Sequence, residues 1–509
     1  MFELTLNFAI YTPPRMPRDK LYQLIHALTT VEKKFFQQYA RRHVTETDTI
    51  YLQLFNAISK QASYDESKLK KQLPLASYNL NFHKAKAYLY SLILKSLVIR
   101  KSNSSAYSQV LELLCSIEIL CEKQFFEQAL ELLEEVKELC RAHEFQELAL
   151  AAIRWEESIA ATSQLMNAGA DLKMADNYSK RKDLLDEITL TVEYRYLFFK
   201  WSLINAPFTP PSTDAIERLA IFFKDPLLDP ENLPKSKAPK RFHMGLNAMK
   251  ARLEANHAKA FELSIGIVKI MESYPRGFYY TEMLLIYAYY SVIMDAVSAG
   301  KFSAAEKYLA KLKKLHPENP QLSYNHFHLL LASELTVLKA MERKRECLTL
   351  IDTFEKSIHR FKPGISRFHE YRNYLLIMNW LVKVKEYERA IIFINLMMQE
   401  KVADQRVLPF QYHARLLMLV VHYELKNLEL LEYLVRQVDY YFSKHPLPLH
   451  FPGILLLYFK NILKPKSNLQ AEQEELTRKL EEVRKNPNEK NGFKGFLDCG
   501  WLQNRGILK

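Results

Sequence analysis

The residues best suited to chemistry are scattered along this chain. His326 and His328 lie two positions apart, and residues at that spacing on a helix point in different directions. No segment resembles a P-loop, a protein-kinase signature or a metalloprotease helix. No pair of the five cysteines has the spacing of a zinc site; they are Cys115, Cys121, Cys140, Cys347 and Cys499. We therefore expect no catalytic residues, no metal and no cofactor, and a protein that is not an enzyme.

The cysteine count also bears on the compartment. An odd number argues against a disulfide framework and favours a reducing environment, so we expect a cytoplasmic location. The longest uncharged apolar run near the middle, Met283–Met294, is shorter than the roughly 20 residues that cross a bilayer. The first 15 residues lack the basic start and cleavage site of a signal peptide. We expect Met16 to be the true start and residues 1–15 to be a disordered or non-native extension.

Glycine is scarce, and this decides the fold class. The 509 residues include 11 glycines, and none occurs before Gly169. Glycine serves where a backbone needs positive φ or must approach a phosphate closely. A chain with so few is expected to be all-α, with short turns between helices and no phosphate-binding loop.

The elements begin with a helical bundle over residues 16–105. Thr29 with Glu32 and Ser63 with Glu66 have the spacing of capping boxes, each of which predicts the start of a helix. Apolar periodicity predicts a long helix from Asn79 to Arg100. The Ser- and Asn-rich stretch at residues 102–105 predicts the end of this module.

A repeat follows over residues 106–463. Its motif is an aromatic residue, two variable residues and an alanine, as in Phe126–Ala129, Phe302–Ala305 and Tyr387–Ala390. Degenerate copies have Cys347 and Leu431 at the alanine position, and weaker ones fall near Ile216 and Ala260. The spacing of 41 to 44 residues predicts about eight stacked helical hairpins.

One unit, AGKFSAAEKYLAKLKKLHPENP, resembles the tetratricopeptide repeat. Its small, aromatic and proline positions are filled by Gly300, Phe302, Ala305, Leu309, Leu312 and Pro317. The other units lack the glycine, and the period exceeds that family's 34 residues. The resemblance implies a right-handed superhelix of hairpins after the N-terminal bundle. The layout is also similar to a group of uncharacterised bacterial proteins with a basic N-terminal helical module, for which no activity is implied.

The same resemblance implies a binding groove. In such arrays the first helix of each hairpin lines the concave face. Its register assigns Tyr287, Tyr290, Arg372 and Asn379 to that face. Tyrosine gives rigid contact area, while Arg and Asn can hold a carboxylate or a peptide backbone. The alternative is that the tyrosines only pack the interface between repeats.

Two segments interrupt the pattern. Residues 207–241 carry seven prolines and predict an irregular break near the middle of the array. Residues 464–509 predict a charged helix, Gln470–Lys485, followed by an apolar cluster that folds back as a terminal cap. That cluster contains Phe493, Phe496, Leu497 and Trp501.

Charge is segregated along the chain. Residues 16–101 contain 15 Lys and Arg against 6 Asp and Glu, whereas residues 112–157 contain 4 against 12. One interpretation is solvated helix surface, or packing of the two segments on each other. The other is contact of the basic module with an acidic partner, through Arg41, Arg42, Lys68, Lys70 and Lys71. A second basic run, from Lys235 to Arg252, predicts a solvated connector or a contact with an anion or acidic peptide.

These features favour a non-enzymatic scaffold that binds a peptide or protein partner in the groove of a helical-repeat superhelix. The alternative is a cytoplasmic regulator whose basic N-terminal module binds nucleic acid and whose repeats sense a peptide or protein. Some bacterial regulators join a helix-turn-helix domain to tetratricopeptide-like repeats in this order. No membrane insertion is expected in either case.

Overall fold

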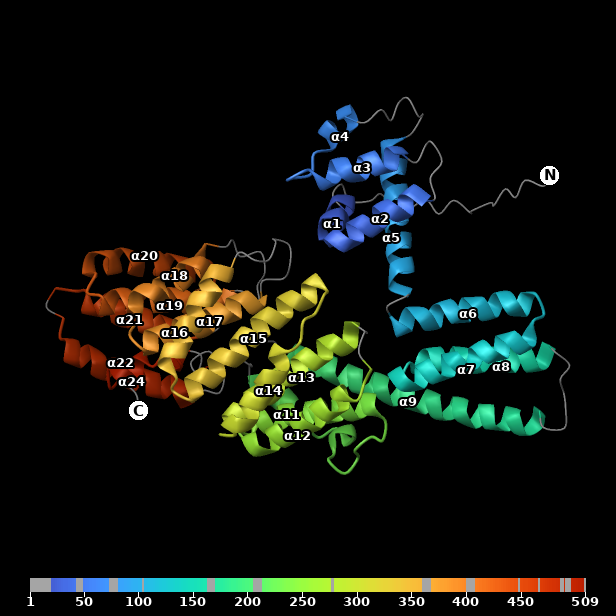
Figure 1. The fold of residues 1–509 in the computed structure, drawn as a ribbon. Coiled ribbons are helices and arrows are strands. Elements are labelled where there is room, and N and C mark those ends of the chain that lie inside the picture. The colour runs from blue at the N-terminus through green and yellow to red at the C-terminus, as the bar shows by residue number, and fades with distance from the viewer. Residues whose placement is uncertain are drawn as a thin grey trace. The chain divides into compact units, whose positions relative to one another are not determined.

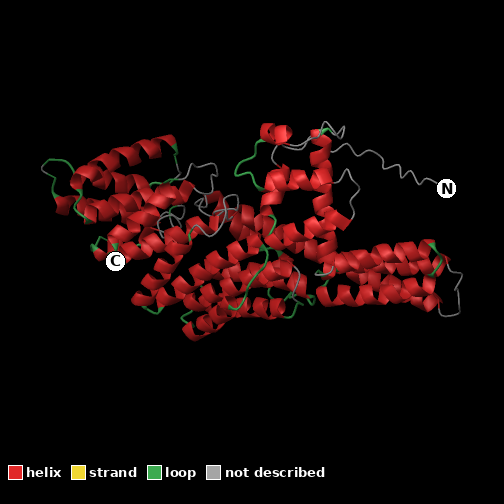
Figure 2. Ribbon diagram, turned by 45° about the horizontal axis from the view of Figure 1, so that its top comes forward, coloured by secondary structure: helices red, strands yellow, loops and turns green. Residues whose placement is uncertain are grey.

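Helices form every regular element in the described part of the chain. The computed structural model describes residues 20–42, 49–72, 81–102, 105–162, 170–204, 213–275, 279–358, 368–399, 408–446, 449–465, 467–485, 489 and 496–507. No strand occurs within these ranges, which confirms the all-α fold class (Figures 1 and 2). The chain divides into two compact units, Met1–Arg181 and Lys182–Lys509. The division falls inside one long helix, α9 (Ala170–Ile204), and the module boundary at residues 102–105 stays a prediction.

The first unit begins with a helical module that has a core of its own. Its buried residues include Leu21, Phe36, Leu54, Phe55 and Leu89. The long helix predicted from Asn79 corresponds to α5. The helices of this module are α1 (Lys20–Ala27), α2 (Thr30–Arg42), α3 (Thr49–Ser59), α4 (Glu66–Gln72) and α5 (Phe82–Ser102).

One predicted capping box is present and the other is not. The backbone N–H of Thr29 donates to the Glu32 carboxylate at 2.7 Å, and the N–H of Glu32 donates to Thr29 Oγ1 at 3.2 Å. At α4 the prediction of a Ser63 cap is wrong. Asp65 instead accepts a hydrogen bond from the backbone N–H of Lys68 at 3.0 Å. Asp65 is a better acceptor at this position because it directly precedes the first helical residue.

The acidic segment forms the rest of the first unit. α6 (Ala106–Glu122), α7 (Phe126–His143) and α8 (Gln146–Thr162) pack in sequence, and the start of α9 follows. Glu156 on α8 is buried and accepts from Lys137 on α7 at 2.7 Å and from Asn177 on α9 at 3.3 Å. Part of the acidic charge therefore holds this unit's own helices together.

The second unit is a series of helical hairpins. From α13 onward, the first helix of each hairpin contacts the first helix of the next, and Figure 1 shows α17, α19 and α21 side by side in this way. The hairpins pair α11 (Lys237–Leu253) with α12 (His257–Glu272), α13 (Tyr279–Ser298) with α14 (Phe302–Lys313), α15 (Pro320–Ala340) with α16 (Lys344–Ser357), α17 (Phe368–Lys383) with α18 (Tyr387–Met398), α19 (Leu408–Glu424) with α20 (Leu428–Lys444), and α21 (Phe451–Ile462) with α22 (Leu469–Lys485).

The proline-rich break is shorter than the sequence predicted. Within residues 207–241 the chain forms α10 (Thr213–Phe222), a short 3₁₀ helix η3 (Pro226–Leu228) and the start of α11. Pro239 lies in the first turn of α11, where a missing backbone N–H costs no helical hydrogen bond. Pro226 and Pro239 therefore lie within the first turns of helices, whereas Pro207, Pro210 and Pro211 lie outside the described residues.

One turn geometry recurs between the helices. A residue with positive φ ends the first helix, and the next residue donates its backbone N–H to the carbonyl five positions back, as in a Schellman motif. For example, Arg343 donates to Leu338 at 3.0 Å and Glu386 to Leu381 at 2.8 Å. The positive-φ residues of these turns are Gln124, Glu144, Ala255, Gly300, Glu342, Lys385 and Lys426. Only Gly300 among them is glycine, so the same turn forms whether or not its positive-φ residue is glycine.

Six positions of the predicted repeat share one local geometry in the structure. Each lies five residues after a positive-φ residue and is fully buried. These positions are Ala129, Ala260, Ala305, Cys347, Ala390 and Leu431. Ile216, the remaining member, has its side chain outside the described residues. Alanine occupies four of these positions, and Cys347 and Leu431 occupy the other two.

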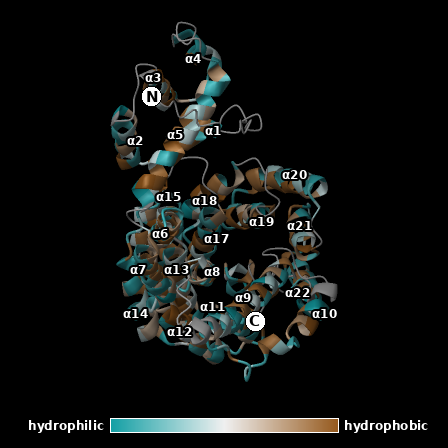
Figure 3. Ribbon diagram, turned by 90° about the vertical axis from the view of Figure 1, so that its right-hand side faces the viewer, coloured by the Kyte–Doolittle hydropathy of each residue, from teal (hydrophilic) through white to brown (hydrophobic). Residues whose placement is uncertain are grey.

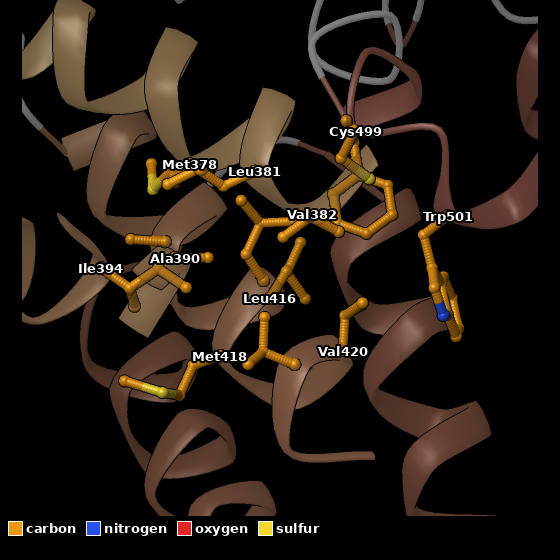
Figure 4. Close-up of a cluster of buried hydrophobic side chains, with 14 of the residues drawn as sticks. Met378, Leu381, Val382, Ala390, Ile394, Leu416, Met418, Val420, Cys499 and Trp501 are labelled. Atoms are coloured by element: carbon orange, nitrogen blue, oxygen red, sulfur yellow. The ribbon is translucent and has the colours of Figure 1, made fainter. Parts of the chain in front are cut away.

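The C-terminal residues pack on the last hairpins. Phe496, Cys499 and Trp501 are buried in the same core as residues of α17, α18 and α19 (Figure 4). Trp501 begins the short helix α24 (Trp501–Asn504), and its indole N–H donates to Glu424 at 2.7 Å. Leu497 is partly buried against this core, whereas Phe493 lies outside the described residues. The Trp501 ring also stacks on Phe459 of α21, with ring centres 5.8 Å apart, so the chain end covers part of the apolar surface of α21.

Candidate binding site on the first helices

Three of the four predicted groove residues come together on α13 and α17. Both helices are first helices of their hairpins, and α15 lies between them in the packing order. The guanidinium carbon of Arg372 lies 4.9 Å from the centre of the Tyr290 ring. Tyr287 contacts the same helix one turn earlier, where its hydroxyl lies 3.1 Å from Nε2 of His369. Tyr287, Tyr290, His369 and Arg372 are hereafter called the Arg372 cluster.

His369 was not predicted from the sequence. It precedes Arg372 by three residues, so both side chains share one face of α17. The periodicity that placed Arg372 on this face could therefore have placed His369 beside it.

The Arg372 side chain has two buried donors without an acceptor. Its Nε and Nη2 atoms are inaccessible to solvent and have no hydrogen-bond partner, and the same holds for Nδ1 of His369. A buried donor left unpaired costs about 1–3 kcal/mol, more when the group is charged. Nε and Nη2 lie on one edge of the guanidinium plane. That edge matches the two oxygens of a carboxylate.

The electrostatics of the cluster favour an anion. Burial, together with the nearby Arg372 charge, lowers the pKa of His369 to about 4. Burial also lowers the pKa of His328 on α15 to about 4, although the Glu370 carboxylate acts in the opposite direction. Glu370 itself accepts a hydrogen bond from the Tyr374 hydroxyl. Both histidines are therefore neutral at pH 7 and leave Arg372 as the positive charge of the cluster.

The structure differs from the prediction at Asn379. This side chain is buried, and its Oδ1 lies 2.6 Å from Nε2 of His413 on α19. Burial lowers the pKa of His413 to about 3, so the ring is neutral and its Nε2–H donates to the amide. Asn379 thus joins two first helices instead of facing a partner.

The basic residues of the N-terminal module are only partly accessible. Arg41, Lys68 and Lys71 are exposed, whereas the side chain of Arg42 lies outside the described residues. Lys70 forms an ion pair with Glu66 at 2.8 Å. Although burial raises the pKa of Glu66, hydrogen bonds from Lys70, Lys86 and Tyr64 lower it to about 2. The Lys70 side chain is 49% exposed, so it pairs with Glu66 and is still partly accessible to a partner.

The other chemically capable residues have structural roles. His326 Nε2 lies 2.8 Å from the carbonyl oxygen of Leu312, and His328 contacts Asn373. Burial raises the pKa of the Cys140 thiol to about 12, which keeps it protonated. Among the described residues, no three His, Cys, Asp or Glu side chains gather as metal ligands.

A pocket of about 550 Å³ opens where α12 and α14 end and α13 begins. Its lining includes Glu272, Tyr289, Lys311 and His316. Glu272 already accepts from Lys311 at 2.6 Å and from the Tyr289 hydroxyl at 2.8 Å. Because these groups already form hydrogen bonds with one another, they need no ligand to pair them, unlike the two unpaired donors of Arg372.

Comparison with protein-family models, curated proteins and solved structures gave no match for this chain. Hydrophilic and hydrophobic residues alternate along the helices, as Figure 3 shows. Across the described ranges, no helix is both long and apolar enough to cross a membrane.

Proposed function

We propose that this chain is a non-enzymatic cytoplasmic scaffold. Its tetratricopeptide-like hairpins would form a superhelix that binds a peptide or protein partner, and Arg372 would hold a carboxylate of that partner. The observation that carries the proposal is the unfilled pair of donors at Nε and Nη2 of Arg372. A partner's Asp, Glu or C-terminal carboxylate would satisfy both.

The contact between Arg372 and Tyr290 supports this role. The Arg372 guanidinium group lies over the Tyr290 ring, 4.9 Å from its centre, and this contact restricts the side chain before a carboxylate binds. Hydrogen bonds to a charged group contribute about 1.5–3 kcal/mol, which corresponds to roughly a tenfold to hundredfold gain in affinity. Because both donor atoms are covered, binding must be accompanied by displacement of a neighbouring side chain.

The test compares Arg372→Met with Arg415→Met. Arg415 on α19 is a matched control, since it lies 3.4 Å from the Tyr441 ring but donates to Gln411 at 3.1 Å and 3.2 Å. Tagged forms of the full chain are used to capture partners from the native lysate, and peptides from the captured proteins are then measured by calorimetry. We expect Arg372→Met to weaken binding at least tenfold and Arg415→Met to leave it nearly unchanged. Equal binding by the wild type and Arg372→Met would refute the assignment.

A second arm addresses the nucleic-acid alternative, which rests on the exposed Arg41, Lys68 and Lys71. Half of each lysate is treated with nuclease before capture. A protein partner retained after nuclease supports the scaffold. Nucleic acid captured only in the untreated half, and lost as salt is raised, would favour the regulator because phosphate contacts release counterions.

A further inference from the structure

Helix α9 presents an apolar row to solvent within the second unit. Val192, Tyr196, Phe199 and Leu203 are 55%, 63%, 59% and 65% exposed. Single exposed apolar residues are ordinary on a protein surface, but a continuous row on one helix is not. A continuous exposed apolar row indicates a surface for interaction.

The opposite face of α9 is fixed in place. Tyr194 is fully buried, and its hydroxyl donates to the carbonyl oxygen of Leu227 at 2.6 Å. Leu197 is buried in the same small core, and Trp201 packs against it. The helix thus cannot rotate to bury the exposed row without giving up these contacts.

The spacing of the row is that of a coiled coil. Its members are separated by four, three and four residues, the alternation that keeps a seam facing a partner helix. Such a seam requires a second helix with the same spacing. The chain itself supplies one when two copies meet.

The flanking charges select an orientation. Glu193 and Lys200 lie on one side of the row, and Arg195 and Ser202 lie on the other. In a parallel pair, Arg195 would face Lys200 of the second copy, and the like charges would repel. In an antiparallel pair with Tyr196 opposite Phe199, Glu193 would face Lys200 twice and Arg195 would face only Ser202.

We propose that two copies of this chain associate through antiparallel pairing of α9, with Val192 opposite Leu203 and Tyr196 opposite Phe199. Four side chains from each copy make a small interface, so the dimer is expected to be weak and to form as concentration rises. This association is independent of carboxylate binding at Arg372.

The first test is sedimentation velocity of the full chain over a hundredfold range of concentration. The wild type should shift from monomer toward dimer, and Tyr196→Glu should remain a monomer. Ile221→Glu on α10 is the matched control, because Ile221 is 69% exposed but lies on another helix. It should dimerise like the wild type, and melting curves should show that both variants are folded.

Charge reversal tests the orientation. Lys200→Glu should weaken the dimer, since Glu193 of each copy would then face a second carboxylate, and adding Glu193→Lys should restore it. A parallel pair predicts the reverse for Lys200→Glu, because Arg195 would gain an attractive partner. A wild type that stays monomeric at every concentration would overturn the proposal. Another partner, or other residues of the chain, would then cover the row. Dimerisation that Tyr196→Glu does not affect would overturn it equally.

Discussion

Two arginines of the second unit present the same pair of donors to different surroundings. On α11, Nε and Nη2 of Arg252 donate to the two oxygens of Asp295 at 2.8 Å and 2.7 Å, and Ser264 supplies a further hydrogen bond to that carboxylate. On α17, Nε and Nη2 of Arg372 have no acceptor. The donor pair of Arg252, here called the closed fork, is filled by an acceptor from the chain itself. Its contacts join α11, α12 and α13. The donor pair of Arg372, here called the open fork, has no acceptor, and we infer that its acceptor comes from outside the chain.

Breaking the closed fork should give the largest effect. Arg252→Ala would leave the buried Asp295 carboxylate with Ser264 as its remaining partner, and removal of one member of a buried pair costs about 3–5 kcal/mol. Urea unfolding would measure this loss. The double variant Arg252→Met with Asp295→Leu should recover most of it, because no uncompensated charge remains. A loss below about 1 kcal/mol for Arg252→Ala would show that the pair contributes little.

Asn379→Ala should give the next largest effect. It removes the acceptor of the buried His413 ring, and a buried donor without a partner costs about 1–3 kcal/mol. Partner binding by the folded fraction should be unchanged. If binding falls while the unfolding midpoint stays the same, Asn379 contacts the partner, as proposed for Arg372.

Arg372→Met should have a smaller effect of opposite sign. The methionine can still cover Tyr290, while the two unpaired donors are removed, so stability should stay constant or rise by about 1 kcal/mol. Differential scanning calorimetry of the unliganded chain would measure it. A clear loss of stability would make Arg372 a structural residue, equivalent to Arg252.

The pH dependence should show the smallest difference. The pKa values of His328 and His369 are near 4 in the folded chain and near 6.5 in the unfolded chain, so the unfolded chain binds more protons between these values. Stability is therefore greatest above pH 6.5 and falls as pH drops toward 4. His369→Gln should make the fall shallower, on the order of 1 kcal/mol. Unfolding midpoints at about pH 7 and about pH 4.5 would test this, with the exposed His257→Gln as control.

Part of the candidate site could be predicted because helical periodicity is local. The register that assigned Tyr287, Tyr290 and Arg372 to first helices depends only on spacing within each helix, and these three residues do come together. Asn379 is seven residues after Arg372 and obeys the same spacing. Its burial depends on α19, which approaches that end of α17 and brings His413 to it. No pattern within one helix could have shown that contact.

The sequence by itself determined the all-α class and the recurrent buried position near the start of the second helix, because these follow from local periodicity and side-chain size. Only the tertiary structure decided which polar groups would be satisfied. Arg252, predicted as part of a solvated or anion-binding run, is closed by Asp295, which lies 43 positions further along the chain. The tertiary structure also decided that residues such as Lys385 adopt positive φ, at a cost of about 1–2 kcal/mol each. Packing on neighbouring hairpins outweighs that local preference.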